Sequence, residues 1–318
     1  MSVKRELIKI LSLSPGRFFS GAALADTLGV SRNAVWKAVE ALRKDGYEIS
    51  AVTNKGYSLC GGTAVLSAEA VCAFADSRLD GVSVKVFESI DSTNAEAKRV
   101  ADKTPGPLLI LAEQQTAGRG RLGRSFYSPP GTGLYMSLMY HPDTSLSENL
   151  SVTAAAAVAV VRAIEKLTDM RPQIKWVNDI FINGKKVCGI LTEAMTDFES
   201  GTDLSVIVGI GINVTTESFP PEVGETTASI GVSRLDRNRL AAEVAAELLR
   251  LIKDLSDRSF MEDYRQHSMV IGREITYIKN GISHSATAIS IDDDGGLKVL
   301  GDQGITVLST GEITLRVK

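Results

Sequence analysis

Residues 118–124, with the sequence Gly-Arg-Gly-Arg-Leu-Gly-Arg, form the densest group of chemically capable side chains in this chain. The glycines permit backbone conformations and close approaches that a larger residue would prevent. The arginines carry a permanent charge and forked donors that match phosphate and carboxylate groups. Apolar runs at residues 107–112 and 134–139 predict a buried strand on each side. A basic, glycine-rich loop between two core strands is placed to close over an anionic ligand.

The glycine spacing of this loop also fits the Gly-x-Gly-x-x-Gly pattern of dinucleotide-binding folds. That pattern requires a helix that begins at the last glycine and binds a pyrophosphate at its N-terminus. Residues 125–133, Ser-Phe-Tyr-Ser-Pro-Pro-Gly-Thr-Gly, cannot begin a helix. The sequence therefore excludes a dinucleotide-binding turn at this position.

A second candidate segment, residues 175–191, combines lysines with polar residues between apolar runs. An Asn-Gly pair at 183–184 predicts a tight hairpin. Strict alternation along the second strand of this hairpin places Lys186 on the same face as Cys188 and Ile190. Both faces are apolar, so spacing leaves two alternatives open. Either one of Lys185 and Lys186 is buried with an anionic partner, or both side chains extend to solvent.

Small polar residues begin an expected helix in the central part of the chain. The sequence Asp-Ser-Thr-Asn at 91–94 follows an expected strand at 82–87, and such residues ordinarily cap a helix. We also expect an Ala/Val-rich buried helix at 149–170, a helix capped by Asp236, and a core strand at 206–214 with a polar tip. Ligands often approach the polar ends of such elements.

The last part of the chain is predicted to contain short strands and turns that form a small barrel. The expected strands are 274–278, 286–291, 297–300, 305–308 and 312–317, with a turn at Asn280-Gly281. Three consecutive aspartates at 292–294 lack the later glutamate and flanking helices of an EF-hand, so we interpret them as a solvated turn.

Residues 1–62 carry nine Lys/Arg and five Asp/Glu, whereas the whole chain has a net charge of −3. Helical periodicity predicts helices at 3–13, 20–28 and 32–44, followed by a hairpin at 47–59. This is the pattern of a winged helix-turn-helix, and its positive charge favours DNA binding over a protein-interaction domain. We expect Trp36 to pack in the core. The candidate DNA contacts are Ser31, which also caps the third helix, Arg32, Asn33, Lys37 and Lys55.

The overall composition limits the class of protein. With 318 residues and 44% hydrophobic content, the chain can form two or three domains. No apolar run approaches the roughly 20 residues of a membrane span, and no signal peptide is evident. The three cysteines and three histidines are scattered, which argues against disulfide frameworks and against zinc or histidine-based metal sites. We therefore expect a cytoplasmic protein without a membrane partner.

Several motifs identify a family when they are taken in their order along the chain. They are Asp91-Ser92-Thr93-Asn94, Gln115-Thr116-Ala117 leading into residues 118–121, Lys175-Trp176-Val177-Asn178-Asp179, Lys185-Lys186-Val187-Cys188-Gly189, and Gly209 to Asn213. In this combination the chain resembles, over its whole length, the bacterial bifunctional biotin protein ligases that also repress the biotin operon.

The resemblance implies an α+β fold with three domains. It implies a winged helix-turn-helix DNA-binding domain at residues 1–62 and a class II aminoacyl-tRNA-synthetase-like α/β catalytic domain at 63–268. It further implies an SH3-like β-barrel at 269–318. The substrates would be biotin and ATP with Mg²⁺, and the product would be biotinyl-5′-AMP. The biotinyl group would pass to a lysine of a carboxylase carrier domain.

The resemblance also implies roles for individual residues. The biotin contacts would be Ser92, Thr93, Asn94, Gln115, Arg119, Gly120, Arg121 and Lys186. The ATP contacts would be Arg121, Arg124, Phe126, Lys175, Asn178 and Asn213. Arg121 and Lys186 would be catalytic, and Asp179 would contact the metal. These cations suit a reaction in which two anions, a carboxylate and a phosphate, meet.

The regulatory role implied by the resemblance is repression of biotin genes. A homodimer that forms with bound adenylate would bind operator DNA. Two rival hypotheses are a repressor that senses biotin without catalysis and a lipoate or octanoate ligase with the same catalytic fold. The chain departs from the family pattern at Val177, where proline is usual, and at Phe126, where tryptophan is common.

Overall fold

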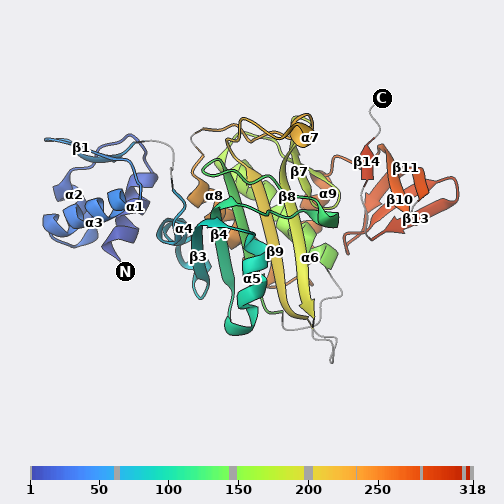
Figure 1. Ribbon diagram of the computed structural model, residues 1–318, viewed down its shortest axis with the longest axis horizontal. Coiled ribbons are helices and arrows are strands. Elements are labelled where there is room, and N and C mark those ends of the chain that lie inside the picture. The colour runs from blue at the N-terminus through green and yellow to red at the C-terminus, as the bar shows by residue number, and fades with distance from the viewer. Residues whose placement is uncertain are drawn as a thin grey trace.

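The computed structural model describes residues 2–60, 65–142, 149–196, 203–233, 235–279, 282–309 and 313–315. Within these ranges, a helical N-terminal unit, a central mixed sheet with helices and a small C-terminal sheet follow one another along the longest axis (Figure 1). No helix in these ranges has the length and hydropathy of a membrane-spanning segment. The expected boundary at residues 62 and 63 lies outside the described residues.

The N-terminal unit is a winged helix-turn-helix, as predicted. It contains α1 (Val3–Ser12), α2 (Gly21–Leu28), α3 (Arg32–Lys44) and the antiparallel pair β1 (Ile49–Val52) and β2 (Gly56–Leu59). The Ser31 hydroxyl accepts a hydrogen bond from Ala34 N at 3.2 Å and thereby caps α3. The apolar stripe of α3, Val35, Ala38, Val39 and Leu42, is buried against α1 and α2.

Trp36 corrects the sequence-based expectation, because its side chain is 51% exposed rather than packed in the core. The buried stripe of α3 starts at Val35 and continues at Ala38 and Val39. A residue one position after Val35 is rotated by about 100° around a helix with 3.6 residues per turn. Trp36 therefore points away from the core, on the exposed side that also carries Arg32.

The central unit is built on one seven-stranded sheet with the order β3-β4-β5-β9-β8-β7-β6. The first pair, β3 with β4, is parallel and the other neighbouring pairs are antiparallel. The strands are β3 (Ser83–Ile90), β4 (Leu108–Gln115), β5 (Gly133–Tyr140), β6 (Gln173–Lys175), β7 (Asp179–Ile182), β8 (Lys185–Thr196) and β9 (Asp203–Asn213).

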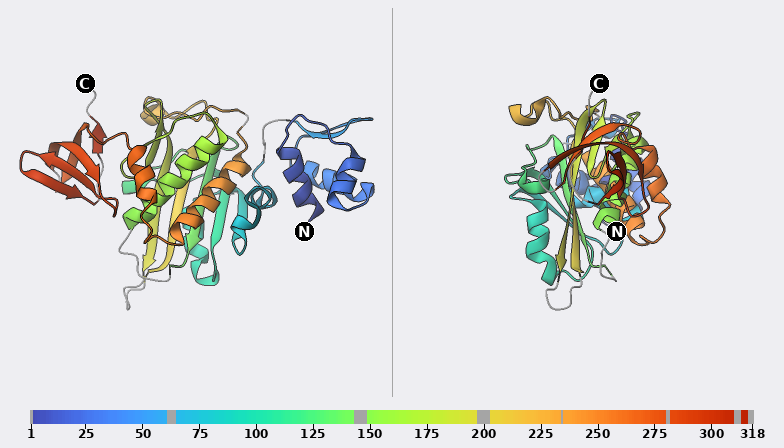
Figure 2. Two further views of the ribbon diagram at one scale, coloured as in Figure 1. Left: turned by 180° about the vertical axis from the view of Figure 1, so that it is seen from behind. Right: turned by 90° about the vertical axis from the view of Figure 1, so that its right-hand side faces the viewer.

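Helices cover both faces of this sheet (Figure 2). Apolar residues of α6 and α8 join one face in a large core, while α5 covers the other face in a smaller apolar cluster. The helices are α4 (Ala68–Ala75), α5 (Thr93–Val100), α6 (Asn149–Leu167), α7 (Pro221–Gly224), α8 (Arg237–Ile252) and α9 (Phe260–Gln266). Short 3-10 turns occur at η1 (Asp76–Leu79), η2 (Ala101–Lys103) and η3 (Arg121–Gly123).

The strand β8 contains a β-bulge that decides to which face of the sheet Lys186 points. Ile180 pairs with Cys188, whereas the next residue of β7, Phe181, pairs with Lys186. The extra residue shifts the alternation of side chains along β8. Lys186 consequently lies beside Gly189, since a Cβ built on Gly189 would be 3.3 Å from Lys186 Nζ. The expectation from strict alternation, which grouped Lys186 with Cys188 and Ile190, is therefore wrong.

The C-terminal unit is a five-stranded antiparallel sheet with the order β13-β12-β11-β10-β14, consistent with an SH3-like fold. Its strands are β10 (Glu274–Lys279), β11 (Ile282–Ile291), β12 (Leu297–Gly301), β13 (Gly304–Leu308) and β14 (Ile313–Leu315). The expected Asn280-Gly281 turn lies outside the described residues. The aspartate run forms a turn in which Asp292 Oδ1 accepts a hydrogen bond from Gly296 N at 2.7 Å and Asp293 pairs with Arg265.

Candidate active site

A cavity of about 410 Å³ opens where α5, the Gly/Arg loop and the strands β7, β8 and β9 meet. The structure brings together every residue that the sequence assigned to biotin, ATP or metal. The lining residues include Ser92, Thr93, Asn94, Gln115, Arg119, Gly120, Arg121, Arg124, Phe126, Lys175, Asn178, Asp179, Lys186 and Asn213. Residues from distant parts of the chain therefore form one site.

One end of the cavity is a neutral hydrogen-bonding network around Thr93. Gln115 Oε1 accepts hydrogen bonds from Thr93 N at 2.9 Å and from Thr93 Oγ1 at 3.1 Å, and Gln115 Nε2 donates to Ser128 Oγ at 3.0 Å. Ser137 Oγ, which is fully buried, lies 2.7 Å from Thr93 Oγ1 and 2.6 Å from Asn94 Oδ1. Donors and acceptors fixed in this way suit a neutral polar ligand group such as a cyclic urea.

Asn94 is held from several directions. Its Nδ2 donates to Glu193 Oε2 at 2.8 Å, and Glu193 forms an ion pair with Lys98 at 2.6 Å. Burial alone would raise the pKa of the Glu193 carboxyl, but the hydrogen bonds from Lys98 and Asn94 outweigh it and lower that pKa. A Cβ on Gly209 would lie 2.2 Å from Asn94 Oδ1, so glycine is needed there for Asn94 to reach its position.

Asp91 fixes the start of α5. Its Oδ1 accepts a hydrogen bond from Ser92 N at 2.7 Å, and Arg99 forms a forked pair with both carboxylate oxygens at 2.8 Å. The Arg99 guanidinium and the Ser92 amide hold the pKa of the Asp91 carboxyl well below its usual range. The Ser92 hydroxyl caps the helix by accepting from Ala95 N at 3.4 Å. These contacts fix the segment that carries Ser92 and Thr93.

The Phe126 ring packs directly on the backbone of the sheet, over the glycines Gly189 and Gly211. A Cβ on Gly211 would lie 2.5 Å from the Phe126 ring, and one on Gly189 would lie 3.4 Å from it. The ring also meets Tyr135 edge to face, with centroids 6.4 Å apart. Phenylalanine at this position therefore provides an apolar wall on the strands β8 and β9.

The Gly/Arg loop folds back on itself through backbone hydrogen bonds. Phe126 N donates to Gly118 O at 2.8 Å, and Gly120 N donates to Arg124 O at 2.7 Å. A Cβ on Gly118 would lie 2.5 Å from Phe126 O, so a side chain there would break this arrangement. The tip is Leu122, which has a φ of +55° and is 75% exposed.

As a whole, the cavity is strongly positive. Its lining includes five basic residues, Arg119, Arg121, Arg124, Lys175 and Lys186, and one acidic residue, Asp179. Arg121 Nη1 donates to Asn178 Oδ1 at 3.0 Å, and Lys186 Nζ lies 2.7 Å from Asp179 Oδ1. In a chain with a net charge of −3, this concentration of cations indicates a site for anionic groups.

Asn213 ends β9 at the wall of the cavity and is 3% exposed. Its Nδ2 donates to Ala228 O at 3.3 Å, whereas its Oδ1 is buried and accepts no hydrogen bond from the described residues. Buried acceptors in proteins are almost always satisfied. Asn213 therefore offers an acceptor to a ligand that carries an amino group.

Comparison with known proteins agrees with this geometry. The Biotin/lipoate A/B protein ligase family matches residues 86–213, and an HTH domain matches residues 3–58. The bifunctional ligase/repressor BirA of Bacillus spizizenii is 35% identical, over 99% of this chain and 99% of that protein. The Escherichia coli protein of the same name is 32% identical, over 96% of both chains.

This chain belongs to the bifunctional ligase/repressor BirA family. Among solved structures, the biotin protein ligase from Aquifex aeolicus in complex with biotin and ATP is similar, with a TM-score of 0.64 and 28% identity. The similarity covers 74% of this chain and 99% of that one.

The family motifs did not include every residue that shapes the site. Ser137 and Glu193 hold Thr93 and Asn94, yet they lie in strands whose other residues are mostly apolar. Ser137 could have been found from the sequence, because it is a lone polar residue in an otherwise apolar strand. Thr226 and Thr227 also line the cavity, and Lys186 N donates to Thr226 O at 2.9 Å. They lie in a loop, so no periodicity pointed to them.

The DNA-binding candidates of this family member lie on α3 and on the β1–β2 hairpin of the N-terminal unit. Arg32, Asn33 and Lys37 are exposed on α3, and Trp36 lies among them. Lys55 is exposed in the turn between β1 and β2, with Nζ 6.0 Å from the centre of the Phe18 ring. The exposed side chains of this unit thus include these cations and two aromatic rings, Trp36 and Phe18.

Proposed function

We propose that this protein joins biotin and ATP into biotinyl-5′-AMP, transfers the biotinyl group to a lysine of a carboxylase carrier domain, and represses biotin genes. The observation that carries the enzymatic part is the cavity itself. It combines a neutral polar end at Thr93 and Gln115 with a cationic end at Arg121 and Lys186. This matches the bound pair of substrates. Biotin has a neutral polar head group, and its carboxylate meets the anionic phosphates of ATP.

In the first step a biotin carboxylate oxygen attacks the α-phosphorus of ATP, and the bond to the β-phosphate oxygen breaks as pyrophosphate leaves. Lys186 and Arg121 would lie beside the oxygens on which negative charge collects. Asp179, now paired with Lys186, would release it to the phosphate. In the second step the neutral carrier amine attacks the biotinyl carbonyl, AMP leaves, and the amine loses a proton to water.

We assign the remaining contacts to the nucleotide and to biotin. Phe126 would cover the ligand from the side of β8 and β9, and Asn213 Oδ1 would accept the adenine amino group. Asn178, Lys175 and Arg124 would contact the phosphates. Ser92, Thr93, Asn94 and Gln115, with Arg119 and Gly120 above them, would surround the biotin head group.

A magnesium ion fits the donor set of this cavity. Mg²⁺ in nucleotide sites binds one or two carboxylates and otherwise phosphates and water. Among the residues that the structure describes, Asp179 is the one acidic side chain that lines the cavity, and no cluster of three His, Cys, Asp or Glu occurs. Asp179 would therefore hold a metal that is bound mainly through the triphosphate, where it would neutralise phosphate charge.

The N-terminal unit supports the repressor part of the proposal. Trp36 is a large apolar side chain left exposed among cations, and thymine offers a methyl group to such a side chain in the major groove. Arg32, Lys37 and Lys55 would contact phosphates. Because a two-fold dimer binds two half-sites, we infer that the adenylate tightens DNA binding by favouring a homodimer. Sedimentation with and without the adenylate tests the dimer.

Mass spectrometry of a carrier domain incubated with this protein, biotin and ATP tests the ligase reaction. We expect the carrier to gain one biotinyl group and ATP to release pyrophosphate. A protein that binds biotin but releases no pyrophosphate would instead be a sensor. The same assay with lipoate in place of biotin tests the rival substrate. If the carrier is modified with lipoate and not with biotin, the protein is a lipoate ligase. Because the proposed partners are ATP and DNA, we infer that the protein acts in the cytoplasm.

A further inference from the structure

Residues 65–79, which we call the junction segment, connect the N-terminal unit to the central sheet and contact both. The segment contains α4 and η1. Figure 1 shows α4 between the N-terminal unit and β3. Its contacts decide whether the DNA-binding unit is loosely tethered or held in one orientation.

On the central side, Asn238 binds the backbone of the junction segment. Asn238 is the second residue of α8 and has 0% exposure. Its Oδ1 accepts a hydrogen bond from Ser67 N at 2.8 Å, and its Nδ2 donates to Val65 O at 3.0 Å. Separating these groups would leave buried donors and acceptors unsatisfied. This side chain therefore fixes the path of the chain at residues 65–67.

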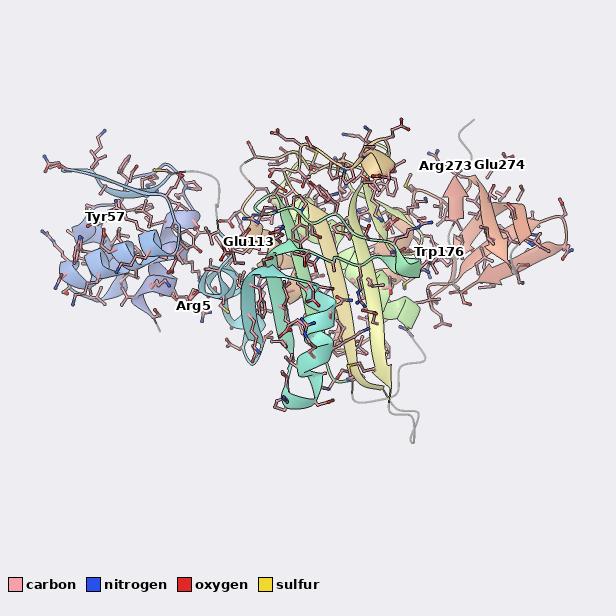
Figure 3. The ribbon with its side chains drawn as sticks, viewed as in Figure 1. Arg5, Tyr57, Glu113, Trp176, Arg273 and Glu274 are labelled. Carbon is pink, nitrogen blue, oxygen red and sulfur yellow. The ribbon has the colours of Figure 1, made fainter. Side chains whose placement is uncertain are left out.

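Glu113 and Arg237 add a second attachment on the same side. Leu66 N donates to Glu113 Oε1, and the Arg237 guanidinium pairs with Glu113 at 2.7 Å. Arg237 is 3% exposed and also donates to Gly133 O at 3.1 Å. Figure 3 shows Glu113 on the side of the sheet that faces the N-terminal unit. The segment is thus bound to both α8 and β4.

On the other side, polar contacts join the junction segment to the N-terminal unit. Tyr47 Oη lies 2.8 Å from Ser67 Oγ, the same residue whose amide is bound by Asn238. Arg5, labelled in Figure 3, donates from Nη2 to Cys72 O at 2.7 Å. Lys9 Nζ lies 2.7 Å from Asp76 Oδ1. Tyr47 and Asn238 therefore meet the same residue from opposite units.

The apolar contacts of α4 follow the same division. Ala70 and Ala73 belong to the apolar cluster of the N-terminal unit, whereas Val71 and Ala75 belong to the central core. A Cβ on Gly46 would lie 2.7 Å from Val65 Cγ2, so the N-terminal unit also approaches the junction segment closely there. Burial on both sides means that neither unit can move away from α4 without exposing apolar surface.

We propose that the junction segment holds the helix-turn-helix in one fixed orientation on the central domain, with Asn238 as the positioning residue. In a dimer the two α3 helices then have a fixed separation, so that paired half-sites are bound tightly at one spacing only. A flexible tether would tolerate many spacings, whereas a fixed geometry loses the second contact when the spacing changes. The DNA part of this inference rests on the proposed repressor function.

The orientation can be tested without DNA by ¹⁵N relaxation of the full-length protein. In the wild type, amides of α1–α3 and amides of the central sheet are expected to report the same rotational correlation time. In Asn238→Ala the amides of α1–α3 should report a shorter one. A shorter time for α1–α3 already in the wild type would overturn the fixed orientation. Equal times in the variant would remove Asn238 from its proposed role.

The consequence for DNA can be measured with duplexes selected from a random pool by the wild-type protein with biotin and ATP. Lengthening the half-site spacing by roughly 5 base pairs, half a helical turn, should weaken wild-type binding by about tenfold or more. Asn238→Ala should lose most of this discrimination and bind a single half-site like the wild type. Unchanged discrimination in the folded variant would contradict the inference.

Two controls separate this inference from folding and from the proposed function. The first control is Arg239→Ala, which changes the next residue of α8. Among the described residues, no hydrogen bond is recorded between the Arg239 side chain and the junction segment. This variant should therefore behave as the wild type. Adenylate synthesis should be the same in all three proteins. If none of them binds DNA, the repressor proposal fails, and the relaxation result alone decides whether the orientation is fixed.

Discussion

At the scale of single residues, Lys186 lines the cavity and pairs with Asp179 at 2.7 Å, and we assign it to the reacting phosphate. We expect Lys186→Met to lower the rate of adenylate formation by roughly 10²–10³-fold, as removal of a donor to a charged transition state does. Lys185→Met, one position earlier and exposed, is the matched control. Pyrophosphate release measures both. Equal rates in the two variants would remove Lys186 from catalysis.

Gly209 tests how the end of the cavity that we assign to biotin is built. A Cβ there would lie 2.2 Å from Asn94 Oδ1, so Gly209→Ala must displace Asn94 from Ser137 and Glu193. Loss of one such buried contact costs about 1–3 kcal/mol, and we expect KM for biotin to rise about tenfold or more. Gly106→Ala, where the nearest atom is 3.9 Å away, should leave KM unchanged. Similar KM values in both would show that Asn94 is not needed for biotin.

At the scale of elements, the start of α5 depends on the charge of Asp91. Its pKa is lowered by Arg99 and the Ser92 amide, so Asp91 stabilises the fold above its unfolded pKa of about 3.9. That contribution is lost as the pH falls through the lower folded pKa. Both side chains of the pair are more than a third exposed, so the effect should be below about 1 kcal/mol.

Urea unfolding of the wild type and of Asp91→Asn, measured from pH 7 downwards, checks this. The variant should be less stable at pH 7, and the difference should shrink as the pH drops below about 4. A difference that grows in acid would show that Asp91 does not act through its charge.

Local signals in the sequence were sufficient for many elements. Ser31 caps α3 and Asp236 caps α8, and the Asn-Gly pair forms the turn between β7 and β8, each as expected. Two elements needed information that the sequence does not display. The bulge in β8 depends on pairing with β7, and α4 buries two faces, so it has no single apolar stripe.

The candidate site could be predicted for a different reason. Its residues belong to motifs with a fixed order, and these motifs specified their chemistry before their positions were known. What the motifs did not specify is the support behind them. Ser137 and Glu193 come from other strands and meet their partners only in the folded chain. Trp36 was misassigned because large apolar residues are usually buried.

At the scale of the whole molecule, the candidate active-site cavity lies in a central unit that is attached on both sides. The junction segment joins it to the DNA-binding unit. On the opposite side Trp176, labelled in Figure 3, donates from Nε1 to Gly295 O at 2.9 Å. The C-terminal unit contributes Ile313 to the wall of the cavity. Ligand binding should therefore depend on how firmly the C-terminal unit is held.

Arg265 offers a way to loosen the C-terminal unit from outside the cavity. It lies on α9, donates from Nε to Ile291 O at 2.8 Å and pairs with Asp293. A hydrogen bond from a charged donor is worth about 1.5–3 kcal/mol, of which only part would reach the cavity. We therefore expect Arg265→Ala to raise KM for ATP severalfold and to leave binding to a single DNA half-site unchanged.

The matched control for Arg265→Ala is Arg250→Ala, because Arg250 makes a comparable surface ion pair with Glu247 on α8. Trp176→Phe provides a second way to loosen the same unit, since it leaves the buried Gly295 carbonyl without its donor. If the C-terminal unit acts through its placement, Arg265→Ala and Trp176→Phe should raise KM for ATP together. A rise in Trp176→Phe alone would mean that Trp176 acts locally in the cavity wall, and that the C-terminal unit does not control ATP binding.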